Sequence, residues 1–314
     1  MMNTLKYLPG KYNKPFFILL FILCLMPFIS PAIALFMGLA FGMTAGQPFP
    51  VFSKKTSKYL LQFSVVGLGF GMNLHESLQT GKEGMVFTIV SVASVLILGM
   101  YLGKRLMMDR KTAYLVSAGT AICGGSAIAA VAPVIKANDN EMSMSLGTIF
   151  ILNAIALFIF PPIGHLLGMT QEQFGMWAAI AIHDTSSVVG AGAAYGEKAL
   201  EIATMVKLTR ALWIIPMTIV TMFLFKQKGA KITIPWFIFF FILAMIANTY
   251  LSIPQEVSGA LVWLAKKGLT VTLFLIGAGL SRRVIKNVGI RPMVQGVILW
   301  IFIGLISLGV IMLL

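Results

Sequence analysis

The sequence predicts an all-α polytopic membrane protein with about eleven transmembrane segments. Of its 314 residues, 58% are hydrophobic and only 11% are charged, and the mean hydropathy is +0.92. Soluble domains hold about 25% charged residues. The basic residues stand between apolar segments instead of gathering on one polar domain, so the formal charge of +14 does not indicate a nucleic-acid partner.

Apolar stretches near the length of a spanning helix, about 20 residues, recur along the chain. We expect segments at residues 15–29, 31–46, 58–75, 84–103, 112–137, 142–167, 171–195, 198–225, 235–251, 257–281 and 293–313. Pro31 and Pro292 lie at or beside segment starts, where a missing amide hydrogen costs little. No polar stretch is long enough for a soluble domain, so residues 1–314 are expected to form a single membrane domain.

The distribution of Lys and Arg predicts the orientation. With the N-terminus in the cytoplasm and eleven alternating crossings, the inner segments hold 17 basic residues and the outer ones 5. This excess favours a cytoplasmic N-terminus and an outer C-terminus in a bacterial inner membrane. Residues 32–34 (AIA) also resemble a signal-peptide cleavage site, but a second apolar segment follows at once, which favours a retained first helix.

The segment count also suggests an internal repeat. Five segments between residues 31 and 167 would match five between 171 and 313, with 15–29 as a peripheral addition. Inverted repeats of this kind are typical of secondary transporters.

The segment at 112–137 carries the first candidate site. Cys123, Gly124, Gly125 and Ser126 interrupt its apolar run. Two adjacent glycines weaken a helix by about 1 kcal/mol each relative to alanine. A break would leave a half-helix beginning near Ser126, whose first amides favour an anion. The alternative is a close helix-packing face of small residues.

The segment at 171–195 carries five consecutive polar residues, which are His183, Asp184, Thr185, Ser186 and Ser187. A charged side chain at membrane depth costs at least about 2.5–3.5 kcal/mol on insertion scales, so a charged residue there usually has a function. We expect His183 and Asp184 to couple protons or sodium, and the three hydroxyls to bind substrate. The alternative is an interfacial turn in which Asp184 caps a new helix.

Two basic residues lie inside the segment at 198–225. Lys207 and Arg210 are three residues apart and share one helix face. Asp184 could neutralise only one of them, so a bound anion is expected to supply the rest. Snorkelling to the outer interface, or pairing with Glu201, is the alternative.

These motifs together resemble a known family. Residues 121–130 (AICGGSAIAA), 183–190 (HDTSSVVG) and 207–210 (KLTR) are similar to the bacterial YeiH-type sulfate exporters over most of the chain. The resemblance implies distant kinship with bile-acid/sodium symporters and cation/proton antiporters. In those proteins two broken helices cross in a core domain that packs on a panel domain.

Transferred to this chain, the resemblance makes 112–137 one crossing helix and 257–281 the other. Gly277, Gly279 and Ser281 would then also contact substrate.

The expected function is secondary transport of a small anion of the sulfate, sulfite or organic sulfonate class, and not enzymatic catalysis. An anion channel is one alternative, and an intramembrane serine hydrolase using Ser126 and His183 is another. No phosphate-binding Gly-x4-Gly-Lys-Ser/Thr motif is present, which disfavours pumping driven by ATP. We expect no cofactor, no metal and no nucleic acid. The expected partners are the anion, a coupling proton or sodium ion and the bilayer, and a homodimer is left open.

Overall fold

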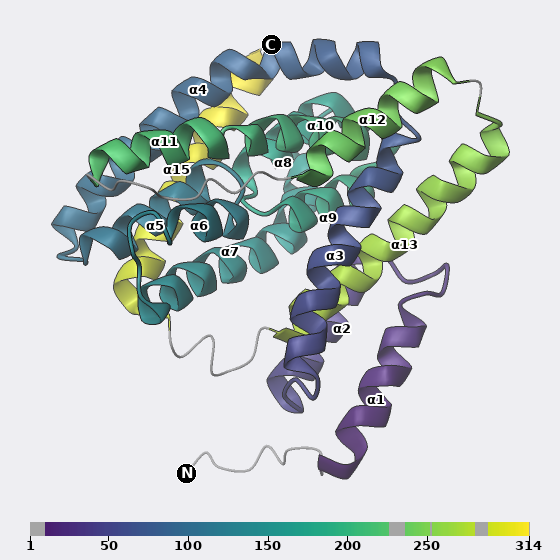
Figure 1. Cartoon of the computed structure of the whole chain (residues 1–314), viewed down its shortest axis with the longest axis horizontal. Helices are drawn as coiled ribbons and strands as arrows, with labels where there is room; N and C mark the ends of the chain where they lie inside the picture. The colour runs from purple at the N-terminus through teal and green to yellow at the C-terminus, as the bar shows by residue number, and fades with distance from the viewer. Residues whose placement is uncertain (1–9, 226–235, 252, 280–287, 314) are drawn as a thin grey trace. The chain divides into compact units, whose positions relative to one another are not determined.

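The computed structural model describes residues 10–225, 236–251, 253–279 and 288–313, and every regular element in this part of the chain is an α-helix. The helices are labelled in Figure 1, and their bounds are α1 Gly10–Leu23, α2 Pro31–Thr44, α3 Pro50–Gly69, α4 Leu74–Arg105, α5 Arg110–Ala121, α6 Gly125–Val131, α7 Asp139–Leu166, α8 Gln171–Ala181, α9 Thr185–Tyr195, α10 Glu197–Leu212, α11 Ile214–Leu224, α12 Trp236–Tyr250, α13 Gln255–Gly279 and α15 Ile290–Leu313.

These helices lie where the sequence places apolar segments, and three of the segments are divided into two helices. Within the described residues, five helical stretches are long and apolar enough to cross a membrane: Phe87–Arg105, Asp139–Leu166, Glu197–Leu224, Gln255–Gly279 and Ile290–Leu313. Shorter apolar helices occupy Asn13–Leu23, Pro31–Thr44 and Trp236–Tyr250. The prediction of an all-helical, multi-pass membrane protein is therefore confirmed, while the number of crossings and their orientation stay predictions.

Several helices begin at side chains that satisfy the free amides of a first turn. Asn138 accepts from the amide of Glu141, whose carboxylate accepts in return from the amide of Asn138. Thr170 and Gln173 form the same reciprocal pair at the start of α8. Such capping boxes fix where a helix starts, and they set the short connections on either side of α7.

The chain divides into two compact units, which are described separately. The first comprises residues 1–72 and 240–285, and the second comprises 73–239 and 286–314. The expected single membrane domain with two five-helix repeats stays a prediction.

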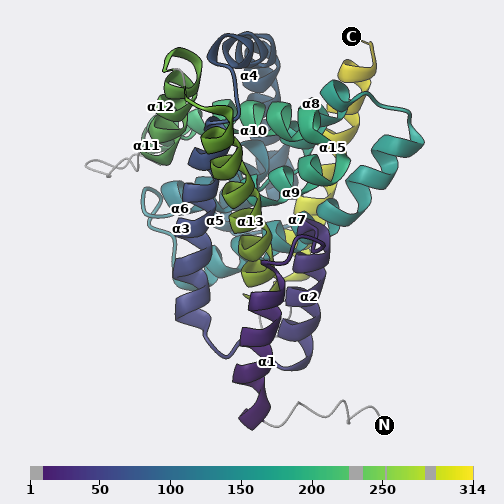
Figure 2. The same ribbon diagram turned by 90° about the vertical axis from the view of Figure 1, so that its right-hand side faces the viewer.

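In the first unit, α13 packs along α2 and α3, as Figure 2 shows. Small residues permit this approach: a Cβ on Gly277 would lie 2.5 Å from the carbonyl oxygen of Leu35, and one on Gly42 would lie 2.6 Å from that of Ala278. The break expected at Gly277–Ser281 stays a prediction, because α13 is described as far as Gly279 and residues 280 and 281 lie outside the described part of the chain. Gly277 itself packs α13 against α2.

In the second unit, α5 packs against α4, α7 and α15, while α10 packs against α8, α9 and α4. Buried polar side chains join these helices. The side-chain amide of Gln295, on α15, donates to the carbonyls of Gly99 and Ala113 and to the hydroxyl of Ser117. The indole of Trp177, on α8, donates to the carbonyl of Gly304 at 2.9 Å. These bonds connect α15 to three other helices of the unit.

Candidate functional site

The first helix break separates α5 from α6 and confirms the break predicted at the paired glycines. Helix α5 ends at Ala121 and α6 begins at Gly125. Between them Gly124 has φ 65° and ψ −124°, a conformation that a residue with a Cβ rarely adopts. Glycine is therefore needed at this position to turn the chain inside a buried region.

The second break separates α8 from α9 at the polar run. Helix α8 ends at Ala181 and α9 begins at Thr185. Asp184 is the N-cap residue of α9, and its carboxylate accepts from the amides of Ser186 at 3.1 Å and Ser187 at 3.3 Å and from the hydroxyl of Ser186. The capping role weighed for Asp184 is thus what the structure shows, at a helix break within the fold.

Asn153, on α7, forms hydrogen bonds with the backbone of the second break. Its side-chain oxygen accepts from the amide of His183 at 3.0 Å and from that of Asp184 at 3.2 Å. Both amides lie outside a helix, so without Asn153 they would lack these partners. One buried side chain therefore satisfies two backbone donors of the break.

The two breaks lie against each other. A Cβ built on Gly124 would stand 3.4 Å from both the backbone nitrogen and the Cα of Asp184, and 3.2 Å from the side chain of Ile149. The break between α5 and α6 thus lies directly beside the break between α8 and α9 (Figure 1). We call this place the junction, meaning residues 121–125 and 181–185.

Lys207, on α10, is completely buried beside the junction. Its ammonium donates to the carbonyls of Ile182 at 2.8 Å, Ile122 at 3.0 Å and Ala179 at 3.2 Å. The first two carbonyls belong to the residues just past α8 and α5, and the third lies in the last turn of α8. A helix C-terminus carries about half a negative charge, so the ammonium offsets two such ends at once.

Arg210 is also completely buried, one turn farther along α10. Its guanidinium donates to the hydroxyl of Ser91, on α4, at 2.9 Å and to the carbonyl of Ala121. Arg210 thus joins α4 and α10 to the end of α5. Its Nε is buried and has no partner in the described part of the chain.

The structure corrects the expected surroundings of the two cations. Neither Lys207 nor Arg210 has a described carboxylate within 4.0 Å, so neither forms an ion pair with Asp184 there. Glu201 pairs instead with Lys198, at 3.2 Å. Both cations have 0% exposure, which also rules out snorkelling. Backbone carbonyls, which a sequence does not display, supply most of their partners.

Five buried polar atoms, in four side chains near the junction, lack a hydrogen-bond partner among the described residues. They are the Nε of Arg210, the Nδ2 of Asn153, the Oγ1 of Thr120 and both ring nitrogens of His183. His183 has only 1% exposure, and Asn153 has 2%. Buried polar groups are nearly always satisfied, so such a cluster is typical of a place that water or a ligand occupies.

The other expected site residues fall in three places. Cys123 and the three hydroxyl residues Thr185, Ser186 and Ser187 are buried at the junction or in the first turn of α9. Ser126 is exposed on α6. The pairing with His183 that a serine hydrolase requires is absent, because neither ring nitrogen of His183 has a described partner.

Gly277 and Gly279 belong to the first unit, and Ser281 lies outside the described residues. Sequence reasoning missed Asn153, Ser91 and Thr120 as residues of the site. The signal for Asn153 was present, since it is an amide in the middle of an apolar segment. Within the described ranges no three His, Cys, Asp or Glu side chains are grouped as metal ligands.

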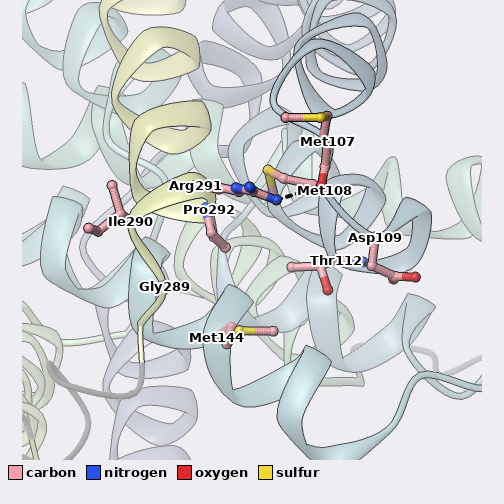
Figure 3. A pocket seen from close by; sticks show the side chains of 9 residues that line it. All are labelled: Met107, Met108, Asp109, Thr112, Met144, Gly289, Ile290, Arg291 and Pro292. Atoms are coloured by element: carbon pink, nitrogen blue, oxygen red, sulfur yellow. Dashed lines mark hydrogen bonds between the residues drawn. The ribbon is translucent and has the colours of Figure 1, made fainter.

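A cavity of about 420 Å³ lies elsewhere in the second unit, between the turn after α4 and the starts of α5, α7 and α15 (Figure 3). Its lining is rich in methionine and includes Met107, Met108, Met144 and Pro292. Arg291 crosses this region and donates to the carbonyl of Met107 at 3.0 Å. None of the lining residues belongs to the junction, so this cavity is separate from the candidate site.

The comparisons with known proteins agree on one family. A family profile described as Conserved hypothetical protein 698 matches residues 16–296. A UPF0324 membrane protein of Bacteroides thetaiotaomicron is 64% identical over 286 residues, which is 90% of this chain and 86% of the relative. One from Porphyromonas gingivalis is 58% identical over 289 residues, with 91% and 88% coverage.

A third relative, from Shewanella oneidensis, is 44% identical over 300 residues, with 96% and 95% coverage, and carries the same description. No solved structure matches the chain. These relatives are described as membrane proteins of bacteria, with no substrate, so the sulfate exporter resemblance stays an expectation. The profile and the relatives together show that this chain belongs to the Conserved hypothetical protein 698 family, the UPF0324 membrane proteins.

Proposed function

We propose that the chain is a secondary transporter that carries a small anion across the bacterial membrane and binds it at the junction. The observation that carries this proposal is the charge balance there. Lys207 and Arg210 are completely buried, and Asp184 is the one carboxylate that the described chain brings to the two breaks. A bound anion would offset the excess positive charge, which is costly to bury.

The hydrogen-bond donors that lack partners also favour a negatively charged substrate. Arg210 Nε and Asn153 Nδ2 can only donate, and His183 and Thr120 can each donate one hydrogen. Oxyanions accept several such bonds at once, and charge-assisted bonds to them are about twice as strong as neutral ones. Sulfate, sulfite and organic sulfonates present this chemistry, and they are the substrate class that the family resemblance implies.

The helix breaks favour transport over simple binding. Irregular backbone at membrane depth is tolerated only where it is buried in protein or faces a water-filled cavity. In secondary transporters, broken helices form substrate and ion sites near the middle of the bilayer. The inverted repeat belongs to this proposal, because alternating access uses two related halves. The cytoplasmic N-terminus, expected from the distribution of basic residues, belongs to it as well.

Asp184 is the proposed coupling group, with His183 beside it. The Asp184 carboxylate caps α9 and carries the negative charge that opposes an incoming anion. Protonation there would remove this charge, so a proton and an anion would bind together. This arrangement would couple anion movement to the proton gradient.

The test uses protein reconstituted in liposomes and exchange of radiolabelled sulfate against unlabelled sulfate, sulfite or a small sulfonate. The informative variant is His183→Ala, because the His183 ring makes no described hydrogen bond that the fold would lose. We expect saturable exchange by the wild type and at least a tenfold loss in the variant. The matched control is His165→Ala, since His165 stacks on Tyr195 away from the junction.

Two results would refute the proposal. One is the absence of binding, exchange and uptake over the whole anion panel by folded wild-type protein. The other is anion current through the protein that no proton or sodium gradient influences, because uncoupled flux is the behaviour of a channel.

A further inference from the structure

We propose that the carbonyl oxygens of Ile122, Ala179 and Ile182 form a site for one small monovalent cation, and that the Lys207 ammonium occupies it as a tethered ion. The occupancy of this site is independent of the transported substrate. Its consequence for coupling rests on the proposed transport function.

The geometry is that of a coordinated ion. An ammonium has three hydrogens, and Lys207 gives one to each of the three carbonyls at 2.8–3.2 Å. No hydrogen remains for another partner. Rings of backbone carbonyls replace the hydration shell of an alkali ion in the same manner.

The source of the carbonyls strengthens the inference. Ile122 and Ile182 are the C-cap residues that follow α5 and α8, so their oxygens have no partner within a continuing helix. In membrane transporters, unwound carbonyls and the C-terminal ends of half-helices are the groups that bind coupling cations. Here a side chain of α10 fills the position that a free cation would take.

Two simpler roles for Lys207 do not fit. A buried ion pair would bring a carboxylate within reach, and no described carboxylate lies within 4.0 Å of this ammonium. A residue that covers a lipid-facing surface would leave its charged head exposed, whereas Lys207 has 0% exposure. The ammonium is directed at backbone oxygens alone.

The Lys207 ammonium in this site bears on which ion is coupled to transport. A chain that carries its own cation at this place needs no sodium ion there to complete the fold of the junction. Of the two coupling ions considered, protons at Asp184 would then remain, and wild-type stability and exchange should not depend on sodium.

The experiment measures thermal unfolding of purified wild type and Lys207→Ala in detergent. The salts are the chlorides of sodium, ammonium, methylammonium and N-methyl-D-glucamine at equal ionic strength. Lys198→Ala is the matched control, because Lys198 lies on the same helix with a 42% exposed side chain paired to Glu201. No anionic substrate is present beyond chloride, so the result is separate from the outcome of the exchange assay.

We expect the wild type and Lys198→Ala to unfold at the same temperature in all four salts. Lys207→Ala should unfold at a lower temperature in N-methyl-D-glucamine and recover in a saturable way with at least one small cation, because a bound ion stabilises the folded state by mass action. Where Lys207→Ala is not recovered folded, Lys207→Gln replaces it in the same salts.

Three results would overturn the inference. The first is unfolding of the Lys207 variants that small and large cations affect equally. The second is failure of both variants to fold in every salt, since a cation site should accept a free ion. The third is a wild-type unfolding temperature that rises specifically with sodium.

Discussion

The side-chain oxygen of Asn153 lies 3.2 Å from the backbone nitrogen of Asp184, and the same oxygen lies 3.0 Å from the nitrogen of His183. An amide in the middle of α7 thereby holds the break between α8 and α9. The carboxylate of Asp184 is positioned by this bond at the start of α9, where it binds the first amides of that helix.

Asn153→Leu should destabilise the second break. The change removes the acceptor of two buried amides, and an unsatisfied buried group costs about 1–3 kcal/mol. We expect a lower unfolding temperature and loss of anion exchange. Asn153→Asp keeps an acceptor and should fold better than Asn153→Leu, but its added negative charge should weaken anion binding. Equal stability of Asn153→Leu and the wild type would contradict the role of this bond.

Gly124→Ala should impair both folding and exchange. Its φ of 65° with ψ of −124° lies in a region that strains a residue with a Cβ by about 1–3 kcal/mol, and the new methyl would lie 3.2 Å from Ile149 and 3.4 Å from Asp184. Gly168 has a similar φ of 64° with no described atom within 4 Å of its would-be Cβ. Gly168→Ala should therefore lower stability through its backbone conformation alone and leave exchange intact. Unchanged exchange in folded Gly124→Ala would show that the first break tolerates a side chain.

Gly277→Ala should disturb the packing of α13 on α2, because its Cβ would stand 2.5 Å from the carbonyl oxygen of Leu35. We expect a clear fall in unfolding temperature, since a backbone oxygen cannot move aside as a flexible side chain does. Gly259→Ala, on the same helix, meets no described atom within 4 Å and serves as the control. Wild-type stability in Gly277→Ala would argue against this helix contact.

The orientation can be tested with cysteines introduced at two lysines, the exposed Lys104 and Lys198, whose side chain is 42% exposed. Lys104, on α4, is expected to face the cytoplasm, and Lys198, on α10, the outer side. A membrane-impermeant maleimide should label Lys198→Cys in intact spheroplasts and Lys104→Cys only after permeabilisation. The native thiols, Cys24 and Cys123, are buried and should give little background. The opposite pattern would invert the proposed topology.

Local chemistry made much of the fold predictable. The paired glycines at 124 and 125 predict the first break, because one of them takes a backbone conformation that other residues avoid. The polar run that begins at His183 coincides with the second helix break, between α8 and α9. Segment positions follow from hydropathy, and the helix ends agree with them to within a few residues at most boundaries.

Two glycine motifs that the resemblance treats alike have different surroundings in the structure. Gly124 turns the chain at the first break beside Asp184, whereas Gly277 packs α13 on α2. Glycines that bring two backbones close and glycines that end a helix look alike in a sequence. Only the position of neighbouring helices separates the two cases.

The surroundings of the buried cations were also beyond prediction. The carbonyl of Ile122 that binds Lys207 comes from 85 residues away, and that of Ala179 from 28. Every residue has a carbonyl, so residue types do not reveal which oxygens become free when helices end. At the junction the C-terminal ends of α5 and α8 are matched by the N-terminal ends of α6 and α9, so the helix ends together leave the count of side-chain charges unchanged.

Lys207 holds the ends of α5 and α8 with a single ammonium group. Drawing those ends apart would remove hydrogen bonds from a fully buried charge, which makes their separation energetically costly. Any conformational cycle is thus expected to move the two breaks together as one rigid block, with the hinge located outside them.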